Sequence, residues 1–179
     1  MKKFISLILL TVFLTGCGSA DLSITAESDR KEEVTEAKKI VVDGETVPDD
    51  LSNDGFDYDL TNLSANMMYG QVFDMMMNPE KYTGKTFRIK GLFSYYKDPA
   101  EKQYFSVYIP DAGACCGQGI EFVLNGEHKY PDDYPDPATE ITVTGTFNSY
   151  EEYAVTYCQL IDAEIVEIGE KDERYNYNG

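Results

Sequence analysis

The sequence is poor in the side chains on which much enzymatic and nucleic-acid chemistry depends. Its 179 residues contain one histidine, no tryptophan, and 15 lysines and arginines against 32 aspartates and glutamates, a formal net charge of −17. This excess of negative charge opposes binding to phosphate backbones, so we expect no nucleic-acid partner. The motifs of a nucleophile elbow, a P-loop, a zinc protease and a dinucleotide-binding turn are missing. We therefore expect the protein not to be an enzyme and to carry no cofactor.

Long hydrophobic runs are also missing, except near the N-terminus. Residues 1–16 begin with Lys2 and Lys3, continue with an apolar stretch and end in small residues, which is typical of a secretory signal peptide. This stretch is too short for a permanent transmembrane helix, and no later segment is apolar for long enough to span a bilayer.

The signal peptide ends in residues 14–17 (LTGC), which resemble the lipobox of bacterial lipoproteins. The resemblance implies that the thiol of Cys17 takes a diacylglycerol and that the chain is cut just before this residue. An ordinary signal peptide that ends near a cysteine is the alternative. Two or three acyl chains hold a protein on a membrane, because each buried methylene contributes about 0.8 kcal/mol. The resemblance thus implies a lipid anchor on the extracytoplasmic face of a bacterial, Gram-positive cell membrane.

Residues 17–60, which follow the anchor, are acidic and lack a regular hydrophobic period. Such a segment cannot bury enough apolar surface to offset its ordering entropy, so we expect a flexible, disordered linker. Residues 50–59 (DLSNDGFDYD) look superficially like a calcium loop, but Thr61 stands where the bidentate glutamate belongs. At the other end, residues 169–179 are predicted to form a disordered tail.

Residues 61–77 (TNLSANMMYGQVFDMMM) predict one amphipathic helix that ends at Asn78 and Pro79. Its five methionines carry thioethers, which are soft ligands suited to copper. Their spacing follows the apolar face of the helix, however, so we favour a core-facing stripe. The positions of that stripe are Leu63, Met67 or Met68, Val72, and Met75 or Met76.

After this helix the hydrophobic period changes to two, which is typical of strands. Five such segments lie at residues 87–96, 104–109, 120–124, 141–147 and 154–168, and glycine interrupts the first and fourth at Gly91 and Gly145. Residues 130–137 (YPDDYPDP) contain three prolines and predict a stiff loop. Five strands are too few for an immunoglobulin sandwich. We expect a mainly β protein in which residues 61–168 form one preceding helix and a small five-stranded barrel.

Residues 79–93 (PEKYTGKTFRIKGLF) and 141–147 (ITVTGTF) resemble the first and fourth strands of OB-fold modules. The resemblance covers roughly residues 78–168 and implies a Greek-key barrel whose third and fifth strands run side by side and parallel. The family commonly places a helix between strands three and four, where this chain has the proline-rich loop. One barrel end is thereby left for the methionine-rich helix to close.

The same resemblance implies a ligand face on the second and third strands and on the loops between strands one and two and between four and five. The tyrosines expected there could stack on a sugar, a peptide or an aromatic ligand. The strand propensity of tyrosine explains their presence equally well. The candidate ligand-face residues are Tyr96, Tyr104, Tyr108 and Tyr153.

Three further cysteines, Cys115, Cys116 and Cys158, would lie close together in such a barrel. Residues 111–123 (DAGACCGQGIEFV) are similar to the Cys-Cys segment of an OB-like extracytoplasmic domain in uncharacterised Firmicute proteins that are partners of proposed permeases. We consider a disulfide from Cys158 to Cys115 or Cys116. The alternatives are burial as small apolar side chains, or a thiolate site for zinc or copper with a fourth ligand. The candidates for that fourth ligand are Asp111, Glu121 and His128.

These features lead to the hypothesis of a lipid-anchored, extracytoplasmic, non-enzymatic module that binds a protein partner or a small ligand. The alternative hypothesis is a thiolate metal-binding or redox accessory protein of a membrane transporter. The partners expected are the membrane, through the lipid anchor, and a permease or a surface protein.

Overall fold

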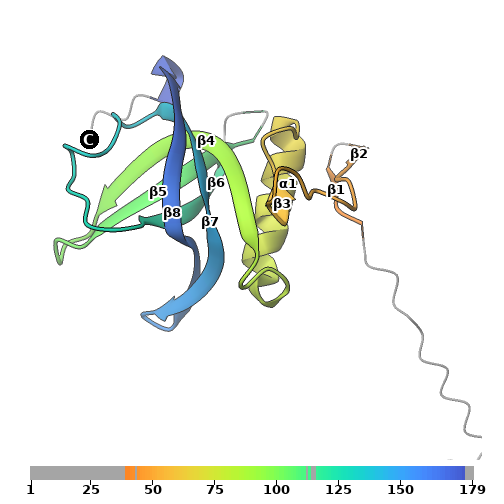
Figure 1. Cartoon of the computed structure of the whole chain (residues 1–179), viewed down its shortest axis with the longest axis horizontal. Coiled ribbons are helices and arrows are strands. Elements are labelled where there is room, and N and C mark those ends of the chain that lie inside the picture. Colours follow the sequence, from red (N-terminus) through yellow and green to blue (C-terminus); the bar gives the residue numbers. More distant parts are fainter. Residues whose placement is uncertain (1–38, 43, 112, 114–115, 176–179) are drawn as a thin grey trace, which may run out of the picture. The chain divides into compact units, whose positions relative to one another are not determined.

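The computed structural model describes residues 39–42, 44–111, 113 and 116–175. The predicted signal peptide, Cys17, most of the predicted linker, Cys115 and the last four residues of the predicted tail lie outside the described residues. The described part is mainly β, with one α-helix that precedes the long strands, and this confirms the predicted fold class (Figure 1).

Five long strands form a sheet that partly closes on itself. Their order is β4-β5-β6-β8-β7, and β7 pairs again with β4. The pairs are antiparallel except for β6 and β8, which run parallel with Glu121 beside Gln159. The parallel contact between the third and fifth strands is therefore confirmed. The bounds are β4 Thr86–Lys97, β5 Gln103–Pro110, β6 Gly117–Leu124, β7 Thr139–Glu152 and β8 Val155–Lys171.

Strand β4 pairs with two other strands along its length. Its first half pairs with β7, and its second half, from Leu92 onward, pairs with β5. Where the two halves meet, a Cβ on Gly91 would lie 2.7 Å from both the carbonyl oxygen of Tyr108 and Cγ1 of Val107. Only a residue without a side chain allows this approach without displacement of a neighbour. The glycine that interrupts the first predicted strand thus lies where β4 passes from one partner strand to the other.

The helix α1 (Ala65–Met77) contributes to the same core as the strands. Its first turn is capped by Ser64, whose Oγ accepts a hydrogen bond from the Met67 backbone N–H at 3.4 Å. After Asn78 the chain continues as the 3-10 helix η1 (Pro79–Lys81). Met68, Val72 and Met75 are buried in one cluster with the inward side chains of the strands. The core-facing stripe is therefore present, whereas the neighbouring Met76 and Met77 are exposed.

The proline-rich segment between β6 and β7 forms a loop, as predicted. Two of its tyrosines pack against aromatic side chains of the sheet. The Tyr134 ring stacks on Phe105 with 4.2 Å between centroids, and the Tyr130 ring stacks on Tyr95 at 4.0 Å. This loop therefore contributes aromatic surface to the core rather than only connecting two strands.

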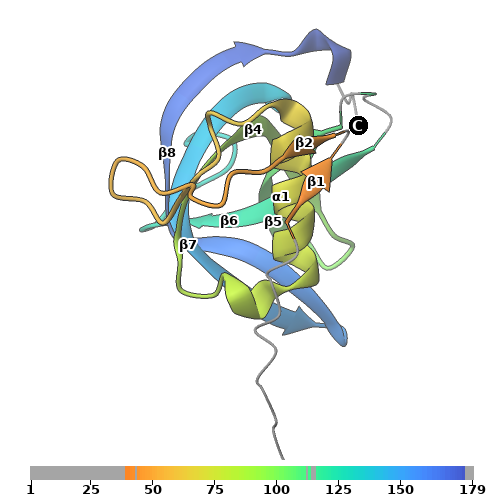
Figure 2. The ribbon, with the colours of Figure 1, turned by 90° about the vertical axis from the view of Figure 1, so that its right-hand side faces the viewer.

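The packed body extends beyond residues 61–168 at both ends. The short strands β1 (Val41–Val42) and β2 (Glu45–Thr46) form a hairpin beside α1, and β3 (Tyr58–Asp59) pairs in parallel with β4 (Figure 2). Leu60 is fully buried, and after β8 the 3-10 helix η2 (Glu173–Tyr175) buries Tyr175. A few buried apolar side chains hold these segments, and the Asp57 carboxylate adds a hydrogen bond from the backbone N–H of Thr86 at 2.9 Å. The acidic composition of the segments gave no sign of these contacts and predicted a linker and a tail.

Candidate functional site

A pocket of about 540 Å³ lies between two loops at the β5–β6 face of the sheet. One loop, residues 98–102, joins β4 to β5, and the other is the tip of the β7–β8 hairpin at residues 153–154. The floor comes from Tyr104 and Ser106 of β5 and from Glu121 of β6. The remaining lining residues are Tyr96, Asp98, Pro99, Ala100, Glu152, Tyr153 and Tyr157.

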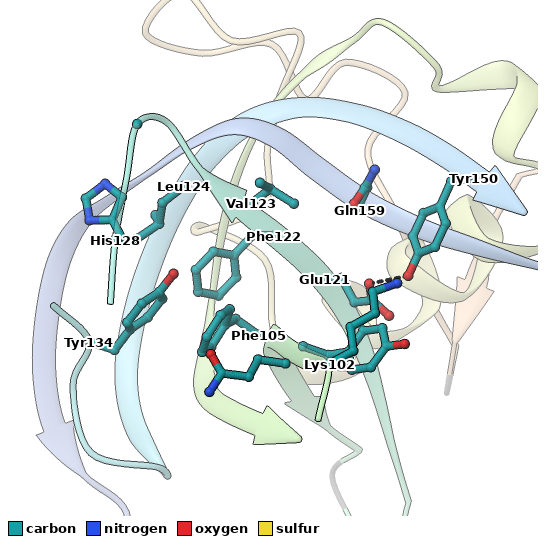
Figure 3. A pocket seen from close by; sticks show the side chains of 13 residues that line it. Lys102, Phe105, Glu121, Phe122, Val123, Leu124, His128, Tyr134, Tyr150 and Gln159 are labelled. Carbon is teal, nitrogen blue, oxygen red and sulfur yellow. Dashed lines mark hydrogen bonds between the residues drawn. The ribbon is translucent and has the colours of Figure 1, made fainter. Parts of the chain in front are cut away.

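A second pocket of about 500 Å³ adjoins the first, because Tyr104 and Glu121 line both. Figure 3 shows its two parts: Lys102, Glu121 and Tyr150 converge at one end, and Phe105, Phe122 and Tyr134 form an aromatic wall at the other. We call the two adjoining pockets the tyrosine groove. The tyrosines that define it are Tyr96, Tyr104, Tyr134, Tyr150, Tyr153 and Tyr157.

The β7–β8 hairpin places two of these rings side by side. Its turn consists of Tyr153 and Ala154, both with positive φ (50° and 61°), as a tight two-residue hairpin turn requires. Counting outward from this turn, Tyr150 pairs with Tyr157. Their rings stack with 5.6 Å between centroids and 24° between planes. The turn therefore sets the register that brings both rings to the groove.

Lys102 holds the only ammonium among the described residues that line the groove. Its Nζ lies 2.6 Å from Oε1 of Glu152, 4.7 Å from the centre of the Tyr104 ring and 5.8 Å from the centre of the Tyr150 ring. The Tyr104 hydroxyl donates to Oε2 of Glu152 at 3.0 Å. The hydrogen bond from Lys102 lowers the pKa of Glu152, and the same bond raises the pKa of Lys102. This part of the groove is therefore a charged pair held between aromatic rings.

Glu121 is half-buried between the two pockets. Burial is the main cause of its raised pKa, and nearby Glu152 adds to it. The Tyr150 hydroxyl donates to Oε2 of Glu121 at 2.7 Å, and this bond, like the charge of Lys102, acts in the opposite direction. The pKa of Tyr150 is raised by its own burial and by this carboxylate. The groove thus contains a second carboxylate, whose negative charge the Tyr150 hydrogen bond and the charge of Lys102 stabilise only in part.

Three of the four tyrosines expected on the ligand face come together in the first pocket. Tyr96, Tyr104 and Tyr153 all line it, and Tyr96 and Tyr153 are well exposed. Tyr108 lies elsewhere, since its ring packs edge-on against Tyr175 with 6.0 Å between centroids.

The two loops expected on the ligand face, residues 97–103 and 148–153, contain Lys102, Tyr150 and Glu152, although these three were not named as candidates. Tyr157 lies outside both loops and was not predicted. The sequence could have predicted that Tyr150 and Tyr157 lie side by side. Residues paired outward from a turn at Tyr153 and Ala154 place these two tyrosines opposite each other. Lys102 and Glu152 lie 50 positions apart in the chain. Their contact depends on how the hairpin folds over the β4–β5 loop, which no local pattern records.

The predicted disulfide is not supported. Cys116 and Cys158 are not bonded to each other, and Cys115 lies outside the described residues. Because Glu121 is beside Gln159 in the parallel pair, Cys158 stands level with Ile120, four residues further along than Cys116. Four residues of strand span roughly 13 Å, whereas a disulfide needs Cα atoms within about 7 Å. Proximity of the two strands was predicted correctly, but the register separates these two thiols.

Cys158 is buried in the core, and burial raises the pKa of its thiol. Of the fourth ligands considered for a metal, Glu121 is engaged with Tyr150, and Nε2 of His128 lies 3.0 Å from the carbonyl oxygen of Asn125. Within the described ranges, no three or more histidine, cysteine, aspartate or glutamate side chains gather closely enough to hold a metal ion. The thiolate site also requires Cys115 and stays a prediction.

One family model matches the chain: the prokaryotic membrane lipoprotein lipid attachment site, at residues 1–17. The match supports a bacterial lipoprotein that is attached to a membrane through lipid. No curated protein matches the sequence. A helix able to cross a bilayer is not found among the residues that the structure describes.

Proposed function

We propose that the protein is a non-enzymatic binding module, held by its lipid anchor on the extracytoplasmic face of a Gram-positive cell membrane, and that the tyrosine groove is its ligand site. The observation that carries this proposal is the gathering of Tyr96, Tyr104, Tyr153 and Tyr157 in one pocket between two loops. Exposed aromatic rings on a concave surface offer large apolar area to a ligand at little cost in conformational entropy.

The strand order supports an OB-type barrel. Numbered from β4, the strands follow the closed order one, two, three, five, four, with the single parallel contact between three and five. Modules of this type bind ligands on strands two and three and between the loops that join strands one to two and four to five. The tyrosine groove lies between the β4–β5 loop and the β7–β8 hairpin, which are the corresponding loops.

Photo-crosslinking in living cells tests this proposal even though the ligand is unidentified. p-Benzoylphenylalanine is placed in the full chain at Tyr153 or at Tyr96, both in the groove, and at Ile168 of β8 as a control that is 61% exposed but outside it. We expect illumination to yield the same covalent adduct from Tyr153 and Tyr96, detected by mass spectrometry, and not from Ile168. An adduct that forms equally at all three positions, or at Ile168 alone, contradicts the proposal.

A further inference from the structure

We propose that the ligand of the tyrosine groove carries an alkylammonium group, and that Lys102 occupies the position of this group until the ligand displaces it. The inference rests on the proposed function and names the chemical class of the ligand for that same site. It assigns to Lys102 the role of a built-in competitor.

The groove already accommodates an ammonium. Nζ of Lys102 contacts the Glu152 carboxylate at 2.6 Å and lies over the faces of two tyrosine rings, 4.7 Å from the centre of Tyr104 and 5.8 Å from that of Tyr150. A carboxylate combined with aromatic faces is the arrangement that attracts an alkylammonium ion. The position of the Lys102 ammonium therefore indicates that this part of the groove favours an alkylammonium ion.

Lys102 is also able to leave this position. Its side chain is half exposed, and the residue stands at the end of the β4–β5 loop, directly before β5 begins at Gln103. Its backbone N–H donates to Oδ1 of Asp98 at 2.8 Å, so the loop stays fixed while the side chain rotates. The Glu152 side chain is only 20% exposed, but the half-exposed lysine end of the pair is screened by water and salt, which weakens the interaction. A ligand can thus displace the lysine at small cost.

The charge of the groove favours a cation as well. Three carboxylates, those of Asp98, Glu121 and Glu152, line the groove against the single ammonium of Lys102. Glu121 accepts its hydrogen bond from the neutral Tyr150 hydroxyl rather than from a cation. A cation complements this surface, whereas an anion meets both the carboxylates and the overall charge of −17.

The direction in which one substitution changes affinity distinguishes a cationic ligand from a neutral or an anionic one. If the ligand is an alkylammonium, the ammonium of Lys102 competes with it, so Lys102→Met strengthens binding. If the ligand is a sugar or an anion that accepts a hydrogen bond from Lys102, the same substitution weakens binding. Methionine keeps an unbranched apolar chain over the Tyr104 ring, so the packing of the groove is largely retained.

Binding is measured on the full chain in detergent with n-butylammonium as the probe and n-butanol as its uncharged control. Because the sequence contains no tryptophan, Tyr153→Trp introduces a single fluorescent reporter at the rim of the groove. In this background we expect Lys102→Met to tighten n-butylammonium binding by about threefold to tenfold. We expect n-butanol binding to be weak and unchanged.

Lys97→Met is the matched control, because it removes the same charge from the same end of the sheet. Lys97 pairs with Glu101 and does not line the groove. We expect it to change n-butylammonium affinity by less than about twofold, through long-range charge alone.

A second pair of variants tests the carboxylate: Glu121→Gln should weaken binding about threefold to tenfold, and Glu164→Gln on β8 should leave it unchanged. Retained thermal unfolding transitions verify that each variant is folded.

Two sources of the ammonium are distinguished with N-acetyl-lysine-methylamide and its norleucine analogue. Tighter binding of the lysine derivative than of n-butylammonium assigns the ligand to a lysine side chain of a partner protein, and equal binding assigns it to a free amine.

The inference is overturned if Lys102→Met weakens n-butylammonium binding or acts no differently from Lys97→Met. In that case a groove-specific photo-adduct at Tyr153 still supports the proposed function, whereas loss of that adduct refutes the proposed function itself.

Discussion

Single residues determine where the strands of this sheet can approach each other and which charges the groove keeps. Gly91 lies where β4 passes from one partner strand to the other, against the backbone of β5. Glu121 lies between the two pockets, where burial and a tyrosine hydroxyl act on it in opposite directions. Each of these positions leads to a prediction that one substitution can test.

Replacement of Gly91 by alanine should destabilise the fold. The new Cβ would lie 2.7 Å from a carbonyl oxygen and a methyl carbon, so the backbone must move. Overpacking of this kind costs about 1–3 kcal/mol of unfolding free energy, which urea denaturation measures. Gly119→Ala on β6 is the matched control, because its nearest neighbouring atom would lie at 3.6 Å, an ordinary contact. Equal effects of the two substitutions would show that the close approach at Gly91 is unimportant.

The raised pKa of Glu121 predicts a pH-dependent stability. Because the folded state favours the protonated carboxyl, the stability that this group contributes is present below its unfolded pKa of about 4.3 and is lost as pH rises through the folded pKa. Glu121→Gln removes this titration. We expect the wild type to lose stability relative to Glu121→Gln as the pH is raised from about 4 to about 7. Urea denaturation at a series of pH values checks this, and a stability difference that is constant across the series speaks against it.

Among the elements, the loop between β6 and β7 does more than its composition indicates. Three prolines predicted a stiff connection, and the structure adds that Tyr130 and Tyr134 insert their rings against Tyr95 and Phe105. The Tyr134 ring also lies within 6.5 Å of Phe93 and Phe122, centre to centre. The loop therefore supports the aromatic wall of the groove.

Tyr134→Ala should cost about 2–4 kcal/mol of unfolding free energy, because it removes a ring that packs on several others. Asp132→Ala, in the same loop, removes an exposed carboxylate whose contact with Lys129 is 3.5 Å, and it should change stability little. Differential scanning calorimetry of both variants measures the difference. Similar melting temperatures for the two would mean that the loop does not contribute to the core.

The sequence predicted the long elements well because their patterns are regular. The period of two located all five long strands, and the OB resemblance predicted the parallel neighbours β6 and β8. The short strand β3 was not predicted, since its two residues cannot show a period, although Asp59 and the neighbouring Leu60 are buried. The contact between Lys102 and Glu152 was not predicted either, because it joins a loop to a hairpin across the groove. Register explains the failed disulfide, since neighbouring strands do not bring every pair of their residues together.

For the whole molecule, the lipid attachment site leads to the prediction that Cys17 alone carries the anchor. Cells that express the full chain and grow with labelled palmitate should incorporate label into the wild type and into the Cys116→Ala control. Cys17→Ala should incorporate none, because the thioether cannot form. Label that persists in Cys17→Ala would require another attachment point and would remove the basis for the proposed localisation.

The position of β8 has a consequence for the order in which the molecule assembles. This strand lies between β6 and β7, although it is the last strand of the chain. A chain that has been delivered only as far as residue 154 therefore has two open sheet edges and no means of joining them. Completion of the barrel must wait for nearly the whole chain, and contacts of such long sequence separation form slowly. We therefore expect the barrel to close only after synthesis has passed β8.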